Sequence, residues 1–118
     1  MGESMSRLLA PLLDLLAVAI FALVGRRSHA HGITLVGVLE TAAPFLCGTA
    51  AGYLVASIAT DAAPRSWQFG TIVVVATVVV GMLFRRLAAA GTAPSFIVVA
   101  TIFLAVTMLA WRVIARFV

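Results

Sequence analysis

The chain has 118 residues, of which 64% are hydrophobic and 10% charged, and its mean hydropathy is +1.19. A soluble globular domain is about 45–50% apolar and about 25% charged, and a chain this short could not hide so many apolar side chains from water. The composition therefore excludes an ordinary soluble domain and predicts a protein that lies mostly in lipid. The formal net charge is +4, and all eight basic residues are arginines that flank apolar segments, which argues against a nucleic-acid partner.

Four apolar segments follow one another along the chain. The first is interrupted only by Asp14 and the second contains Glu40, whereas the third and fourth hold no charge. Each fits the length of about 20 helical residues that a hydrocarbon core of about 30 Å requires. The sequence predicts an all-α fold, a single transmembrane domain over 1–118 that forms a four-helix bundle of two helical hairpins, with helices over about 8–25, 33–60, 67–86 and 93–115.

A weak internal repeat divides the chain into halves. The two Arg-Arg pairs, which begin at Arg26 and Arg85, are 59 residues apart. This offset predicts two hairpins related by an axis along the membrane normal. Asp14 and Glu40 both meet valines at the equivalent positions of the second half, so only the first hairpin carries charge within the membrane.

Asp14 is the first candidate for a functional residue. It lies about seven residues, or about 10 Å, into the hydrocarbon when the helix is counted from Arg7. A carboxylate at such a depth should face the bundle and hold a partner or a proton. Two interpretations remain open: a proton or cation site, and a structural ion pair with Arg112, which falls at a similar depth in the fourth helix.

The second helix carries an intramembrane polar site of its own, formed by Glu40, Thr41 and Pro44. Proline has no N–H to bond the carbonyl of residue 40, so a carboxylate, a freed carbonyl and a hydroxyl gather there. Asp14 and Glu40 would serve as successive points of an ion path. The alternative is that Glu40 pairs with an arginine or a histidine at the near interface.

A third feature gathers basic residues on the side opposite the termini. Arg26, Arg27 and His29 precede the second helix, whose N-terminal N–H groups attract anions. This arrangement predicts a mouth for an anion or a lipid phosphate, with solvated interfacial arginines as the alternative. A metal site is not expected, because His29 and His31 have only Glu40 as a third ligand.

Gly48 and Gly52 form a GxxxG pattern on one face of the second helix. This spacing lets two helix backbones approach closely. It predicts tight helix packing, and a homodimer would form through this helix or through the two uncharged helices. Trp67 and Trp111 fall on the side of the termini and are expected to form an aromatic belt at the interface.

The segments around these residues resemble a family of small four-span prokaryotic membrane proteins labelled domain of unknown function 3054. The similarity rests on Asp14-Leu15-Leu16, on 21–29 with its Gly-Arg-Arg-Ser-His run, on 41–46 and on 91–96, and it covers nearly the whole chain. The resemblance implies an integral four-helix membrane protein and no established activity. It also implies that both termini lie in the cytoplasm, although the arginines are divided equally between the two sides.

The expected function is non-catalytic transport or binding of a small solute, an ion or an anionic lipid headgroup. The alternative is a structural or accessory membrane subunit whose intramembrane charges only lock the helices. No nucleophile–base set or glycine-rich phosphate loop is present, so we expect no enzyme and no cofactor. Membrane lipids are the expected partners, in the plasma membrane.

Overall fold

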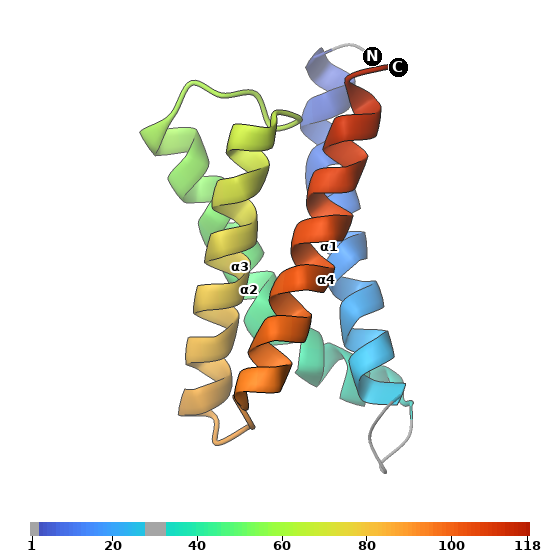
Figure 1. Cartoon of the computed structure of the whole chain (residues 1–118), viewed down its shortest axis with the longest axis vertical. Coiled ribbons are helices and arrows are strands. Elements are labelled where there is room, and N and C mark those ends of the chain that lie inside the picture. The colour runs from blue at the N-terminus through green and yellow to red at the C-terminus, as the bar shows by residue number, and fades with distance from the viewer. Residues whose placement is uncertain (1–2, 28–32) are drawn as a thin grey trace.

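The computed structural model describes residues 3–27 and 33–118, which form four helices and no strand. These are α1 (Glu3–Arg27), α2 (Leu35–Ala59), α3 (Trp67–Leu87) and α4 (Pro94–Ala115). The predicted all-α, four-helix fold is confirmed. Figure 1 shows that both termini lie at the same end of the bundle as the α2–α3 loop, which we call the terminal end. The end of α1, the start of α2 and the α3–α4 loop lie at the opposite end.

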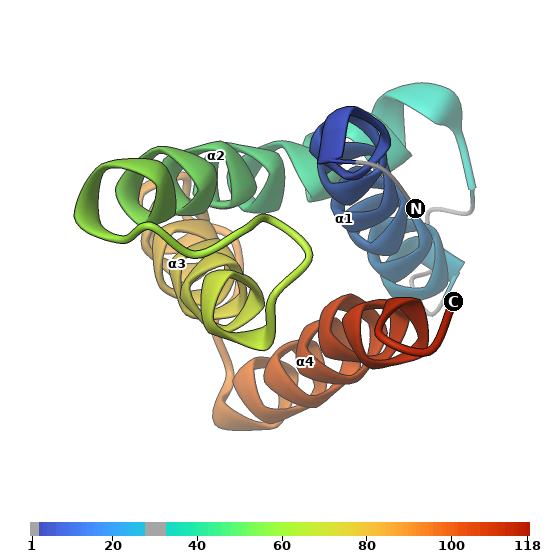
Figure 2. The same ribbon diagram turned by 90° about the horizontal axis from the view of Figure 1, so that it is seen from above.

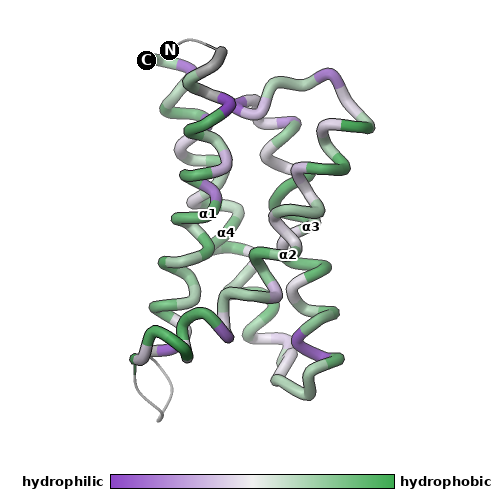
Figure 3. Tube along the Cα trace, turned by 180° about the vertical axis from the view of Figure 1, so that it is seen from behind, coloured by the Kyte–Doolittle hydropathy of each residue, from purple (hydrophilic) through white to green (hydrophobic). Residues whose placement is uncertain are grey.

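All four helices are long and apolar enough to cross a membrane. The longest dimension of the molecule is 43 Å, close to the thickness of about 40–45 Å of a bilayer with its headgroups. Large apolar side chains such as Leu54, Ile58 and Ile102 point away from the core, as lipid-facing residues should. Figure 3 shows apolar residues along the helices and hydrophilic ones gathered mainly towards the two ends.

The helices begin where the sequence offers a cap. The Thr34 hydroxyl accepts a hydrogen bond from the N–H of Gly37 at 3.0 Å, and the Ser66 hydroxyl accepts one from Phe69 at 3.2 Å. Pro94 opens α4 at the position where its missing N–H has no helical partner. In contrast, α1 starts several residues before the apolar segment, because hydropathy marks contact with lipid and not the end of a helix.

Pro44 lies inside α2, nine residues after its start at Leu35. Figure 1 shows the first turns of α2 lying across the lower end of the bundle before the helix turns upward. A proline inside a helix removes one hydrogen bond and crowds the preceding turn, which is the usual cause of such a bend. The bend carries the start of α2 away from the axis of the bundle.

The helices form a ring in the order α1, α2, α3, α4, and α4 returns to α1 (Figure 2). The backbones of diagonally placed helices stay apart throughout the described ranges. Leu35 and Pro94, the first residues of α2 and α4, are 59 residues apart, so the ring has the order that two equivalent hairpins would give. The hairpins meet at two places, which we call the α2–α3 seam and the α1–α4 seam.

The α2–α3 seam is made by close approach of two backbones. A Cβ added at Gly48 would lie 2.7 Å from the Cα of Thr77 and 2.8 Å from the carbonyl oxygen of Ala76. At Gly52 it would lie 2.9 Å from the Cα of Val73. The predicted packing role of the GxxxG pattern is therefore played within one chain, where α3 covers the glycines.

The end of the core away from the termini is aromatic. Phe21 from α1 and Phe45 from α2 meet edge to face with ring centroids 5.1 Å apart, and both contact Phe96 of α4. Phe45 also fills the space that Gly81 of α3 leaves open. All four helices thus contribute to an apolar plug at this end, and the polar groups of the core lie towards the terminal end.

Candidate functional site: the buried Asp14–Arg112 network

Asp14 lies at the middle of α1 and its side chain is completely buried. Arg112, in the last turns of α4, is 1% exposed and forks onto the carboxylate. Its Nη1 donates to Oδ1 at 2.8 Å and its Nη2 donates to Oδ2 at 2.7 Å. A two-pronged arginine–carboxylate contact of this kind is strong and directional. Among the described side chains this is the one ion pair.

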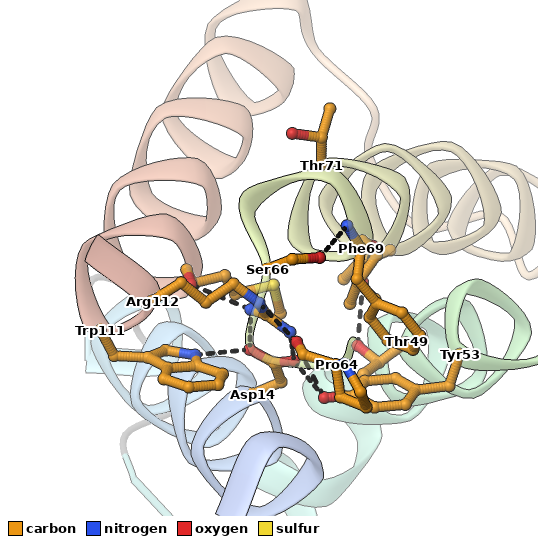
Figure 4. A network of polar contacts seen from close by, with 12 residues as sticks. Asp14, Thr49, Tyr53, Pro64, Ser66, Phe69, Thr71, Trp111 and Arg112 are labelled. Atoms are coloured by element: carbon orange, nitrogen blue, oxygen red, sulfur yellow. Dashed lines mark hydrogen bonds and ion pairs between the residues drawn. The ribbon is translucent and has the colours of Figure 1, made fainter. Parts of the chain in front are cut away.

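Two further donors complete the shell around the carboxylate (Figure 4). The hydroxyl of Tyr53, from α2, donates to Oδ2, and the indole Nε1 of Trp111, from α4, donates to Oδ1 at 2.9 Å. Asp14 therefore accepts four hydrogen bonds, about as many as an ionised carboxylate has lone-pair positions. No acceptor position is left over for a substrate or a metal ion.

Arg112 is held at its other edge by the backbone. Nη1 also donates to the carbonyl of Met108 at 2.9 Å, and Nε donates to the carbonyl of Pro64 in the α2–α3 loop at 3.0 Å. The stem of Arg112 passes over Gly70 of α3, where an added Cβ would lie 2.6 Å from Cδ. One guanidinium thus ties together α1, α4 and the loop, and a glycine on α3 makes room for it.

The sequence left two interpretations of Asp14 open, and the structure places it in the ion pair with Arg112. Depth along two helices was enough to name that partner. Tyr53 and Trp111 were missed, and Trp111 was expected in an interfacial belt. It is half-buried with its indole N–H turned into the bundle. The available signal was that Tyr53, the single tyrosine, stands in an apolar helix, where a hydroxyl usually seeks a partner.

The second predicted polar site does not join this network. Glu40 is exposed on the first turns of α2 and has no hydrogen bond or ion pair with any residue that the structure describes. The hydroxyl of Thr41 donates to the carbonyl of Gly37 at 3.0 Å, within its own helix. Pro44 is half-buried at the bend. Asp14 and Glu40 thus occupy different environments, one fully enclosed and one at the surface.

The predicted anion mouth is seen only in part. Arg26, near the end of α1, is half-buried, and its guanidinium lies where a side chain at Gly37 would be. Its Nε is a buried atom without a hydrogen-bond partner. The side chain of Arg27 and the whole of His29 lie outside the described residues. Arg85 is bound elsewhere, because its Nε donates to the carbonyl of Gly91 at 2.9 Å.

The polar core offers hydrogen bonding and charge pairing, and no coordination site. In the described ranges, no group of three histidine, cysteine, aspartate or glutamate side chains could hold a metal ion. Another polar contact of the core is a hydrogen bond of 2.9 Å between the hydroxyls of Thr49 and Thr77 across the α2–α3 seam. The arrangement can hold helices together, and it can release them if either charge of the ion pair is satisfied by something else.

The comparison with known families identifies the family of the chain. The family described as Protein of unknown function (DUF3054) matches residues 11–115, nearly the whole chain and every residue of the Asp14–Arg112 network. The chain belongs to this family. Neither a curated protein nor a solved structure matches it. The family resemblance expected from the sequence is confirmed, and it brings no activity with it.

Proposed function

We propose that the protein is a non-catalytic membrane protein that binds a small ion and lets it pass along the α1–α4 seam, with the Asp14–Arg112 pair as the gate. The single observation that carries the proposal is the position of this pair. The pair lies in the α1–α4 seam, where no glycines bring the two backbones together. The contact between α1 and α4 is also smaller than the contact between α2 and α3. The ion pair therefore joins two helices that are less closely packed than α2 and α3.

A gate of this kind responds to ions for a simple physical reason. A ligand shifts an equilibrium between two states only by binding one of them better. A proton on Asp14, or an anion beside Arg112, satisfies one member of the pair and so favours the state in which the seam is open. Packed apolar side chains offer no such competition. A pair of buried charges is also a poor source of stability compared with apolar residues of the same size, which fits a switching role.

No reaction is part of this proposal. Asp14 is the acid of the buried core, and its four acceptor positions are filled by Tyr53, Trp111 and Arg112. A general base needs a free lone pair within reach of its proton donor. We therefore assign the carboxylate to holding and releasing α4.

The test is ion flux in vesicles of phosphatidylcholine that contain a pH-sensitive dye, under an imposed pH or potassium chloride gradient. The decisive variant is Asp14→Leu/Arg112→Met, which removes both charges and keeps the seam apolar. We expect flux above that of empty vesicles for the natural chain and none for this variant. Thr49→Val/Thr77→Val is the matched control, because it removes a polar contact from the other seam, and it should keep the flux.

A second candidate function is a structural or accessory membrane subunit, in which the ion pair only locks the helices. The complete set of hydrogen bonds on Asp14 favours it. In that case the natural chain gives no flux with protons, potassium or chloride above that of empty vesicles.

For the location we propose the plasma membrane with both termini in the cytoplasm, as the family resemblance implies. The support is the family resemblance, because exposed arginines stand at both ends, with Arg65 and Arg116 at the terminal end and Arg86 at the other. A cysteine at position 63, in a chain whose Cys47 is replaced by alanine, tests this. An impermeant thiol reagent added outside intact cells should leave it unlabelled.

A further inference from the structure

A cavity of about 590 Å³ lies at the terminal end, between the start of α3 and the end of α4. We call it the terminal cavity, and its polar lining residues are Arg65, Ser66, Gln68 and Arg116. Its volume is within the range of about 300–1,000 Å³ that is usual for small-molecule sites. Neither Asp14 nor Arg112 lines it, although Arg112 donates to the carbonyl of Pro64, which lies between the lining residues Ala63 and Arg65.

The charged side chains that line the terminal cavity are of one sign. Arg65 and Arg116 are exposed, and their side chains have no hydrogen bond or ion pair with any part of the chain that the structure describes. None of the side chains that line the cavity is a carboxylate. Arginine presents several N–H groups in a planar fork that fits the oxygens of a phosphate.

The backbone adds donors at the same place. Ser66 caps α3, and its hydroxyl is already used, because it accepts from Phe69 and donates to the carbonyl of Ala63 at 2.7 Å. The N–H groups of Trp67 and Gln68, in the first turn, have no partner within the helix. Both residues line the cavity, so the positive end of the helix dipole faces the same space as the two arginines.

The depth of the cavity narrows the choice of anion. The longest dimension of the molecule is 43 Å, so the ends of the helices fall at the level of the lipid headgroups. Phosphate groups are concentrated at this level. A phosphate also offers several oxygens to donors that arrive from two arginines and a helix end, whereas a carboxylate or chloride would leave some of them unused.

We infer that the terminal cavity binds a phosphate group, carried by an anionic lipid or by a free phosphate. Arg65 and Arg116 bind the charge from two sides, and the first turn of α3 donates hydrogen bonds from below. The apolar part of the lining, from Ala63, Ala115 and Val118, accepts the carbon atoms attached to a lipid phosphate. The site is separate from the mouth that the sequence indicated at the opposite end.

The test uses the full chain with its own C-terminus, because Val118 is part of the lining. The altered protein is Arg65→Gln/Arg116→Gln. The matched control is Arg7→Gln/Arg86→Gln, which removes the same charge from two exposed arginines that do not line the cavity. Circular dichroism verifies that both variants remain helical.

Two measurements separate the sources of the phosphate. Native mass spectrometry from phosphatidylcholine nanodiscs with added phosphatidylglycerol counts retained anionic lipids. Thermal unfolding in a neutral detergent, titrated with inorganic phosphate against chloride at constant ionic strength, reports a free phosphate. We expect the cavity variant to lose about tenfold in apparent affinity in one of the two measurements, because two charge-assisted contacts disappear, while the control stays unchanged.

The two measurements identify the source of the phosphate. Loss of retained phosphatidylglycerol in the cavity variant alone assigns the site to a lipid headgroup. Loss of stabilisation by inorganic phosphate in that variant alone assigns it to free phosphate. The inference is overturned if the natural chain binds neither, or if the control loses as much affinity as the cavity variant. The flux experiment in phosphatidylcholine vesicles contains no phosphate salt and no anionic lipid, so failure of the gate and failure of this site are distinguishable.

Discussion

The α2–α3 seam and the α1–α4 seam are equivalent contacts between the two hairpins, but different interactions join the helices in each. The offset of 59 residues that relates the hairpins makes Gly52 of α2 equivalent to Trp111 of α4, and Asp14 of α1 equivalent to Val73 of α3. In the first seam Gly52 lets α2 lie on the backbone at Val73. In the second the equivalent residues meet through a hydrogen bond of 2.9 Å between an indole and a carboxylate.

The difference shows two ways to join helices in lipid. Lipid tails are as apolar as the helices, so association depends on close packing and on hydrogen bonds. Glycines give a seam that has no alternative partner and stays closed. A buried ion pair gives a seam whose stability depends on whether each charge has its partner, and that dependence can be changed from outside.

The largest effect should follow from breaking the ion pair on one side only. Arg112→Met leaves Asp14 buried with two donors in place of four, and we expect a loss of about 3–5 kcal/mol in the free energy of unfolding in mixed micelles. Asp14→Leu/Arg112→Met should recover most of that loss, since no unpaired charge remains. Equal losses in the single and the double variant would mean that the pair acts through packing alone.

The next effect concerns the glycine seam. Gly48→Val introduces a side chain that meets the backbone at Thr77, and we expect it to cost about 1–3 kcal/mol of stability through overpacking. Gly25→Ala is the control, because an added Cβ there meets nothing within 4 Å. Unfolding of both variants is followed by circular dichroism. A neutral Gly48→Val would show that the α2–α3 seam has room and is not fixed.

Single hydrogen bonds should give smaller and unequal losses in the two regions. Tyr53→Phe removes a donor to a charged acceptor and should cost about 1.5 kcal/mol. Thr77→Val removes a neutral hydrogen bond from the α2–α3 seam and should cost about 0.6 kcal/mol, the average for such bonds in membrane helices. The same unfolding assay compares them, and the reverse order would contradict the contrast between the two seams.

Most of the fold could be predicted from the sequence, because lipid makes hydropathy decisive. Apolar length fixes the number of helices, and Ser66 and Pro94 mark where two of them begin. The start of α1 was placed too late, since its polar first turn lies outside the hydrocarbon. Pro44 marks the place where α2 bends, but the sequence alone could not show that the helix bends there.

For the site, the sequence predicts the depth of each residue in the membrane but not the direction in which its side chain points. Asp14 and Arg112 lie at similar depths, so their pairing could be named. Which face of a helix turns inward depends on rotation, and this is set by contacts that no single helix encodes. For this reason the sequence left Glu40 open between an intramembrane site and an interfacial pair, and it is exposed, whereas Trp111 was placed at the surface and donates to the core.

The most direct test of the account compares the accessibility of two equivalent buried positions, Val18 on α1 and Thr77 on α3, after replacement by cysteine in a chain with Cys47→Ala. The proteins are reconstituted in vesicles and labelled with an impermeant thiol reagent, with and without Asp14→Asn. We predict that Asp14→Asn speeds labelling at position 18 about tenfold, equivalent to about 1.4 kcal/mol in the free energy of opening, and leaves position 77 unchanged. Equal acceleration at both positions, or none at either, would contradict the claim that the Asp14–Arg112 pair controls the opening of the α1–α4 seam.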